Sequence, residues 1–160
     1  MDCTIILPAD VSDAFELTDL AWSAKRHWGY SDRCMESWRE LLNITPAVIS
    51  EMSVRKLVSP GTIAGFYALQ LTGPRTASLE HFWVLPQFWR QGLGTALFRD
   101  AERVAIQLGA TEFQILSDPN AELFYTRMGA KRIGSLAAPI EGEADRILPL
   151  MKRRLLPIGD

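Results

Sequence analysis

The sequence predicts a single α/β domain over residues 1–160, with a mixed, partly parallel central sheet flanked by helices. Three observations predict this class. Between residues 51 and 85, short runs of strand-forming residues alternate with turn sequences, which indicates an antiparallel meander. An apolar repeat at helical spacing then joins two strand-like segments, an arrangement typical of parallel neighbours in one sheet. A chain of 160 residues is also most simply one domain with its own core.

The elements follow one another at short intervals. A strand at 4–7 ends at Pro8, and Asp10 is placed to cap a helix that runs to about residue 25. Ser31 or Asp32 caps a second helix through about residue 42. A third helix runs from the turn at Gly94 to about residue 108, and a fourth from Pro119 to Gly129. The expected strands are 51–58, 62–71, 76–85, 112–116, 131–136 and 147–152.

Composition argues against several classes of function. The net charge of −2 gives no electrostatic reason to expect a nucleic-acid partner, and no apolar run is long enough to span a membrane. Cys3 and Cys34 lack the spacing of a metal or redox motif, so we expect two reduced thiols and no metal. The N-terminus shows no signal-peptide pattern, which favours a cytoplasmic protein.

The segment from His81 to Leu97 carries the strongest functional signal. An apolar strand ends before Pro86, a short turn contains Gly92 and Gly94, and a helix begins directly after the turn. The N–H groups at the start of a helix lack intrahelical acceptors, and the helix dipole adds partial positive charge there. Because glycine lets an anion approach the backbone closely, the segment predicts a phosphate-binding site.

Two segments resemble the signatures of the GNAT N-acetyltransferase family. Trp89-Arg-Gln-Gly-Leu-Gly94 is similar to the acyl-CoA motif Q/R-x-x-G-x-G/A: both glycines match, whereas Trp89 stands where the family has glutamine or arginine. That first motif residue contributes mainly its backbone, so we expect Trp89 to be a mild departure. The segment 118–130 resembles the second signature, A-x-x-F-Y-x-x-x-G-F/A, whose tyrosine falls on Tyr125. The resemblance extends to the order of elements over nearly the whole chain.

This resemblance implies an N-acetyltransferase with acetyl-CoA as its co-substrate. It implies that Phe82, Trp83 and Val84 present a backbone edge to the pantetheine arm, with the Val84 N–H at the thioester oxygen. Asn120 either binds pantetheine or caps its helix, and the Arg90 side chain either reaches a phosphate or is solvated. The backbone N–H groups expected to hold the CoA pyrophosphate are those of Arg90, Gln91, Gly92, Leu93, Gly94 and Thr95.

Direct acetyl transfer to an amine requires a base for the amine and an acid for the departing thiolate. The family commonly uses the tyrosine at the position of Tyr125 as this acid, although a core aromatic is the alternative for such a residue. Glu80 is our first candidate for the base, since some family members carry a glutamate on this strand. His81 and His27 are its rivals, and strand alternation directs Glu80 and His81 to opposite faces.

The acceptor is less clearly encoded. In the family, the segment between the first two helices forms one wall of the acceptor pocket. Here that segment contains Trp28 and Tyr30, which with Trp83 and His81 suggest a compact aromatic pocket; the alternative is a helix–helix turn packed by aromatic rings. We expect a small-molecule or exposed peptide amine as acceptor.

Two other functions remain open at this stage. A GNAT-fold sensor or interaction module would bind CoA without transferring the acetyl group. A nucleotide-binding loop is disfavoured, because no Gly-Lys-Ser/Thr follows the glycines. The exposed sheet edges are compatible with a homodimer.

Overall fold

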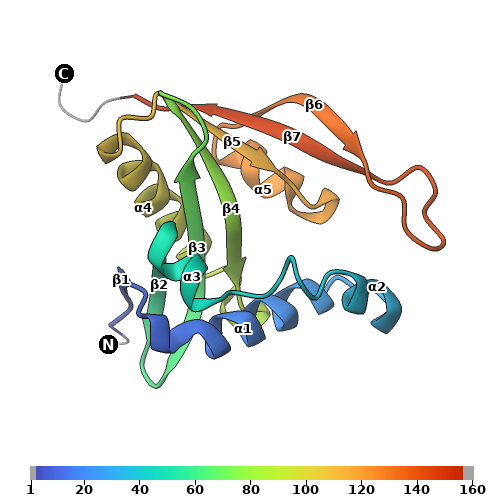
Figure 1. Cartoon of the computed structure of the whole chain (residues 1–160), viewed down its shortest axis with the longest axis horizontal. Helices are drawn as coiled ribbons and strands as arrows, with labels where there is room; N and C mark the ends of the chain where they lie inside the picture. The colour runs from blue at the N-terminus through green and yellow to red at the C-terminus, as the bar shows by residue number, and fades with distance from the viewer. Residues whose placement is uncertain (1–2, 157–160) are drawn as a thin grey trace. The chain divides into compact units, whose positions relative to one another are not determined.

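A computed structural model describes residues 3–156 of the chain (Figure 1). Its seven strands form one sheet in the order β1-β2-β3-β4-β5-β7-β6, in which β4 and β5 pair in parallel. The predicted α/β class with a mixed, partly parallel sheet is therefore confirmed. The chain forms two compact units: one runs to Leu69 and includes His81–Asp100, and the other comprises Gln70–Glu80 and the chain from Ala101. The assignment of residues 1–160 to one domain stays a prediction.

The first unit contains the predicted antiparallel meander. β1 (Ile5–Pro8) pairs with β2 (Ser53–Ser59), and β2 pairs with β3 (Thr62–Leu71). The helical elements are η1 (Val11–Asp13), α1 (Ala14–Arg26), α2 (Asp32–Ser37) and α3 (Pro46–Glu51). Leu17, Ile49 and Phe66 bring α1, α3 and β3 into one apolar core. This core supports the elements that lead to the glycine turn.

Two helix boundaries differ from the prediction. Residues 46–51 form α3, where the sequence analysis begins a strand at Glu51. The Thr45 hydroxyl accepts from the Val48 N–H at 3.1 Å and Pro46 takes the first helical position, so this helix has its own start signal. The second helix ends at Ser37 and not near residue 42, whereas the predicted cap at Ser31 is confirmed.

Several apolar residues of the helical segments are not buried. Val11 is exposed, and the Phe15 side chain is 86% exposed. Phe15 lies two positions before the buried Leu17, and two residues on an α-helix span about 200°, so it faces the opposite side. Leu108 in the later helix is likewise exposed, while Phe98 is buried.

A carboxylate whose side chain is only 12% exposed, that of Asp100, anchors the first half of α4 (Leu93–Gln107). Asp100 Oδ2 accepts from the Arg55 Nε at 2.8 Å and from the Tyr67 hydroxyl at 2.7 Å. Arg55 also donates to the Ile6 carbonyl at 3.3 Å. Because Arg55 lies on β2 and Tyr67 on β3, one carboxylate ties the helix after the glycine turn to two strands.

The second unit carries the parallel pair and the C-terminal strands. β5 (Glu112–Leu116) pairs in parallel with the first part of β4 (Thr76–Val84) and antiparallel with β7 (Ile147–Arg154), which pairs in turn with β6 (Lys131–Ala137). The turn after β5 contains η3 (Pro119–Ala121) and leads into α5 (Glu122–Arg127). Figure 1 shows α5 along one face of β5, β7 and β6, with the β6–β7 loop projecting beyond the strands.

We expect Asp100→Ala to lower the free energy of unfolding by about 3 kcal/mol, because Arg55 and the buried Tyr67 hydroxyl lose their shared acceptor. Urea denaturation measures this loss. Glu36→Ala is the matched control, since it removes the partner of Arg39 in an exposed pair and should leave the unfolding midpoint essentially unchanged. If both substitutions lowered the free energy of unfolding by the same amount, the Asp100 carboxylate would not be an anchor for α4.

Candidate active site

The turn before α4 has the backbone geometry of an anion site. Arg90 has φ +61° and Gly92 has φ +77°, so two left-handed residues flank Gln91. Turns of this kind direct successive N–H groups to one side. The Ala96 N–H bonds to the Gly92 carbonyl at 3.1 Å, but the N–H groups of residues 90–95 find no acceptor within residues 3–156. A cluster of backbone donors therefore faces outward from the first unit.

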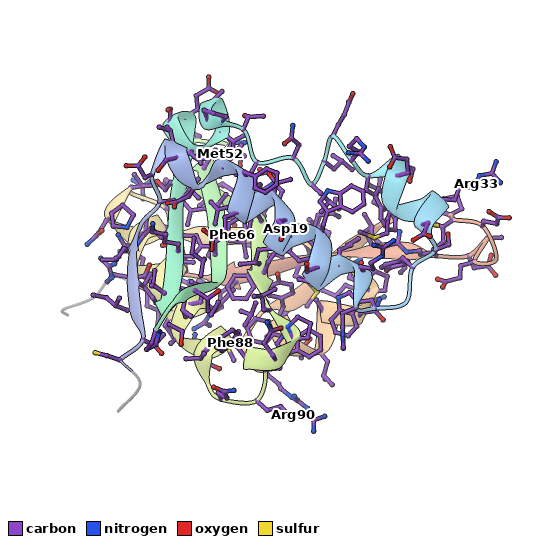
Figure 2. The ribbon with its side chains drawn as sticks, turned by 90° about the horizontal axis from the view of Figure 1, so that it is seen from below. Asp19, Arg33, Met52, Phe66, Phe88 and Arg90 are labelled. Carbon is purple, nitrogen blue, oxygen red and sulfur yellow. The ribbon has the colours of Figure 1, made fainter. Side chains whose placement is uncertain are left out.

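The space above this turn is open. A Cβ built on Gly92 would meet no atom within 4 Å, and Gly92 itself is exposed. The exposed Arg90 side chain projects outward from the same loop and adds positive charge (Figure 2). Several donors, an open approach and a cation fit the diphosphate of CoA. A longer side chain at position 92 would occupy the space that the anion needs.

The Trp89 side chain makes structural contacts of its own, in addition to the backbone role expected for this motif position. Its indole N–H donates to the Val84 carbonyl at 2.8 Å. Its ring lies 5.0 Å from that of Trp28 and meets the His27 ring edge-on at 4.8 Å. The residue that replaces glutamine or arginine in the motif thus packs the glycine turn against the end of β4 and the α1–α2 connection. The expectation of a mainly backbone role did not foresee these contacts.

The last part of β4 runs beyond its pairing with β5. The parallel register ends at Leu79, whereas β4 continues to Val84. On its other side, a Cβ on Gly65 would lie 2.7 Å from the Trp83 carbonyl oxygen, so a glycine is required for β3 to approach β4 this closely. Gly65 was not among the predicted site residues, although a glycine inside a strand pattern signals such an approach.

The two neighbouring base candidates have different surroundings. Glu80 is exposed, and its Oε1 accepts from the Gln70 amide at 3.3 Å. His81 is half-buried, with its ring stacked on Phe66 at 6.2 Å. The His81 Nδ1 accepts from the Trp83 indole at 3.2 Å, which places the proton of the neutral ring on Nε2.

Tyr125 lies in the second unit, buried on α5 with the Phe124 ring 5.3 Å away. Burial raises the pKa of its phenol above the ordinary value near 10, and the negative charge of Asp118 raises it further. The phenol therefore keeps its proton throughout the neutral pH range. A proton donor at this position is always loaded but is a weaker acid than a free tyrosine.

The capping role considered for Asn120 is wrong. The N-cap of η3 is Asp118, whose Oδ1 accepts from the Asn120 N–H at 2.8 Å and from its side-chain amide at 2.9 Å. Asn120 is itself exposed, and its contact with pantetheine stays a prediction. The sequence analysis assigned no role to Asp118.

The two aromatic residues expected at the acceptor wall belong to different clusters. Trp28 is 37% exposed and packs on Trp89. Tyr30 instead meets Trp38 edge-on at 4.8 Å, and the Lys25 ammonium lies over both rings. In the first unit, therefore, Trp28 accompanies the glycine turn, while Tyr30 helps to pack α2.

Other parts of the described chain add no competing site. Within residues 3–156, no group of three or more His, Cys, Asp or Glu side chains is arranged to hold a metal ion, and no helix has the length and apolar character to cross a membrane. A shallow depression of about 220 Å³ lies on the outer face of α1. It is lined by none of the predicted site residues, but by Phe15, Thr18, Asp19, Trp22 and Arg39.

Solved structures share this fold over nearly the full length of the chain. PaiA N-acetyltransferase from Thermoplasma acidophilum, in complex with coenzyme A, matches with a TM-score of 0.74 at 18% identity, covering 95% of this chain and 99% of that one. A GCN5-related N-acetyltransferase from Rhodopseudomonas palustris gives 0.77 at 21%, covering 97% and 98%. The ribosomal-protein-S18-alanine N-acetyltransferase from Escherichia coli gives 0.72 at 17%, covering 99% and 97%. At these identities the likeness establishes the fold.

The seven-stranded mixed sheet of this chain is the fold of these acetyltransferases. The sequence model of the acetyltransferase (GNAT) family matches residues 14–130, so the chain belongs to this family. The family that its two motifs resemble is thereby confirmed. No curated protein matches the chain by sequence.

We expect Arg90→Gly to raise the free energy of unfolding by about 1 kcal/mol, because an L side chain at the left-handed φ of this residue is strained and glycine is not. Arg90→Ala is the matched control, since it removes the same charge but keeps a Cβ, and it should unfold like the wild type. Thermal unfolding of the three proteins makes the comparison. Identical stabilities of the glycine and alanine variants would mean that the turn stores no strain at Arg90.

Proposed function

We propose that this protein transfers the acetyl group of acetyl-CoA to an amine by direct attack of the amine on the thioester. The observation that carries the proposal is the turn at residues 90–95, where backbone donors converge beside an exposed Gly92 and the Arg90 guanidinium. Structural relatives have been solved in complex with coenzyme A, which supports the same ligand here. The N–H groups of Gln91, Leu93, Gly94 and Thr95 share the pyrophosphate with those of Arg90 and Gly92.

The end of β4 is the proposed partner of the pantetheine arm. Phe82, Trp83 and Val84 follow the last residue paired with β5, which supports a peptide-like arm lying beside this segment. The Val84 N–H is the proposed donor to the thioester oxygen, and Asn120 the proposed side-chain contact to pantetheine. The indole of Trp89 supports the segment by binding the Val84 carbonyl.

Tyr125 is the proposed acid. As the amine attacks, a C–N bond forms and the C–S bond breaks, and the phenol gives its proton to the departing thiolate. The amine loses one proton to the base, and solvent returns a proton to the tyrosinate. The products are an amide and free CoA thiol. The buried, protonated phenol supports this role.

Glu80 is the proposed base. Its exposed carboxylate has lone pairs that an ammonium or a bridging water can reach. His81 is less suited, because the Trp83 indole already occupies the lone pair of its Nδ1 and the proton of the neutral ring lies on Nε2. His27 is the second alternative, exposed at the edge of Trp89.

The acceptor is a small-molecule amine or an exposed peptide amine, with Trp28, Tyr30 and His81 as candidate contacts. Structural relatives are named for a ribosomal-protein alanine, for aminoglycosides and for N-acetylglutamate synthesis, so this fold accommodates several acceptor classes. A cytoplasmic location and a homodimer complete the proposal. The position of β6 at the end of the strand order, with Ile133 and Leu136 exposed, supports pairing between two copies.

A CoA-binding sensor without transferase activity is the alternative function. It shares the turn at residues 90–95 and requires no proton donor. The buried Tyr125 beside Asp118 favours the enzyme. Turnover with a panel of small amines and N-terminal peptides, followed by detection of free CoA thiol, separates the two.

We expect Gly92→Glu to weaken CoA binding at least about 100-fold, since its carboxylate would fill the anion's space and repel the phosphates. Gly61→Glu is the matched control: Gly61 has φ +79° and an equally open Cβ position, but it lies in the β2–β3 turn. Calorimetric titration with CoA compares the two variants. Near-normal CoA affinity in Gly92→Glu would show that the turn at residues 90–95 does not bind the CoA phosphates.

We expect Tyr125→Phe to lower kcat about 100-fold while leaving the KM for acetyl-CoA nearly unchanged, because it removes a proton donor and keeps the packed ring. Phe124→Leu is the control for altered packing next to the same position and should keep most of the activity. Steady-state thiol release measures both. An unchanged kcat in Tyr125→Phe would exclude the tyrosine as the acid.

A further inference from the structure

The sheet of the second unit has one face that the helices of this unit cover. Met151 on β7 and its partner Ile115 on β5 are buried on that face. Arg153, two residues further along β7, shares it, and its Nε donates to the Glu102 carboxylate of α4 at 3.1 Å. A Cβ on Gly129, just after α5, would lie 3.0 Å from the Arg153 Nη1. Both α-helical segments described in this unit therefore lie on the Met151 side of the sheet.

The opposite face of this sheet carries Glu80 and a group of leucines. Leu79 and Ile115 are the last residues paired between β4 and β5, and both are buried on the covered face. Glu80 and Leu116 each follow this pair by one position, so strand alternation places them on the opposite face. The register of β5, β7 and β6 puts three further leucines there, and we call the set the leucine patch: Leu116, Leu136, Leu148 and Leu150.

The leucine patch offers apolar surface to a ligand. Leu116 is 48% exposed and Leu136 is 53% exposed, while Leu148 and Leu150 are half-buried. Gly134 pairs with Leu150, and a Cβ built on it would lie 3.9 Å from the Leu150 Cδ2. A side chain at position 134 would therefore lie against Leu150, whereas glycine leaves this side of the leucine uncovered. Covering such surface with an apolar group favours binding, by up to about fourfold in affinity for each buried methylene.

The charges on this face match one ammonium group. Glu80 is the carboxylate beside the patch, and the far end of the face carries three exposed cations: Lys131, Lys152 and Arg154. The Glu112 carboxylate is the exception at that end, and it lies 2.6 Å from the Lys152 Nζ. The β6–β7 loop, which projects beyond the strands in Figure 1, holds three exposed carboxylates: Glu141, Glu143 and Asp145. On the strands themselves, a ligand with several ammonium groups would meet like charge.

We propose that the acceptor is a small primary amine with one positive charge and an apolar body, which the leucine patch binds while Glu80 receives the ammonium group. The inference deepens the proposed function and rests on it in assigning Glu80 to the amine. Neighbouring strands lie about 4.8 Å apart, so carbons about three or four bonds from the nitrogen lie over Leu116. Alkylamines and arylalkylamines of about six carbons or more have this form, and aminoglycosides and polyamines do not.

The kinetic test compares n-hexylamine with 1,6-diaminohexane, which has the same chain and a second ammonium group. With the full chain and saturating acetyl-CoA, release of free CoA thiol should give a kcat/KM at least about tenfold higher for hexylamine, because the diamine has to bring a charge onto the patch. Equal values for the two amines would overturn the proposal. A preference for the diamine would also overturn it and would assign the second ammonium to the carboxylates of the β6–β7 loop.

Leu116→Glu tests the patch directly. Its added carboxylate should lower kcat/KM for hexylamine about tenfold and bring the two amines close together, with the KM for acetyl-CoA unchanged. Leu108→Glu is the matched control, since Leu108 is 42% exposed but directly follows α4, and it should keep the wild-type preference. An unchanged preference in Leu116→Glu would overturn the proposal. If the same variant instead separated a dimer into monomers in sedimentation, the patch would belong to a second copy of the chain.

A binding measurement separates this inference from the proposed function. Without acetyl-CoA, hexylamine should shift the methyl NMR signals of Leu116 and Leu150, and 1,6-diaminohexane should shift them much less. These shifts in a protein that transfers no acetyl group would support the patch and contradict the proposed function. Acetyl transfer to hexylamine with unshifted leucine signals would support the function and overturn the patch.

Discussion

The unsatisfied backbone donors at the start of α4 are the constraint around which the first unit is built. Six N–H groups, those of residues 90–95, have no acceptor within residues 3–156, and two left-handed residues direct them outward. Arg90 adopts its left-handed conformation at a cost of about 1 kcal/mol. The buried Asp100 holds the helix behind this turn to two strands. The donors are thus oriented without a ligand, so an anion would bind there with no rearrangement of the turn.

Trp89 links this turn to the rest of the first unit in a way that glutamine or arginine would not. Its indole holds the Val84 carbonyl, and its ring packs on Trp28. Gly65 allows β3 to lie against the same end of β4. The glycine turn, the end of β4 and the α1–α2 connection are therefore coupled through one side chain. The departure from the family motif is a change in how the loop is supported, while its backbone donors are kept.

Much of the fold could be predicted because its signals are local. The strands 62–71 and 112–116 have the predicted bounds, and the caps at Asp10 and Ser31 are present, since turns and caps depend on a few adjacent residues. The six-residue α3 was missed because a helix this short is not long enough to show an apolar repeat. The glycine turn was predictable for the same local reason. The contacts of Trp89 and the Asp118–Arg146 pair were not, because they join residues that only the folded chain brings together.

Tyr125, the proposed acid, illustrates a conflict that a buried proton donor has to resolve. Burial holds the phenol in one place and keeps it protonated, but it also raises the phenol's pKa, which makes transfer to a thiolate with a pKa near 8–9 less favourable. The nearby Asp118 increases this difficulty, yet it is needed to cap the turn that leads into α5. Moving the carboxylate would disrupt the turn, and exposing the phenol would lose its fixed orientation. The carboxylate is itself paired with Arg146, a buried residue 28 positions further along the chain.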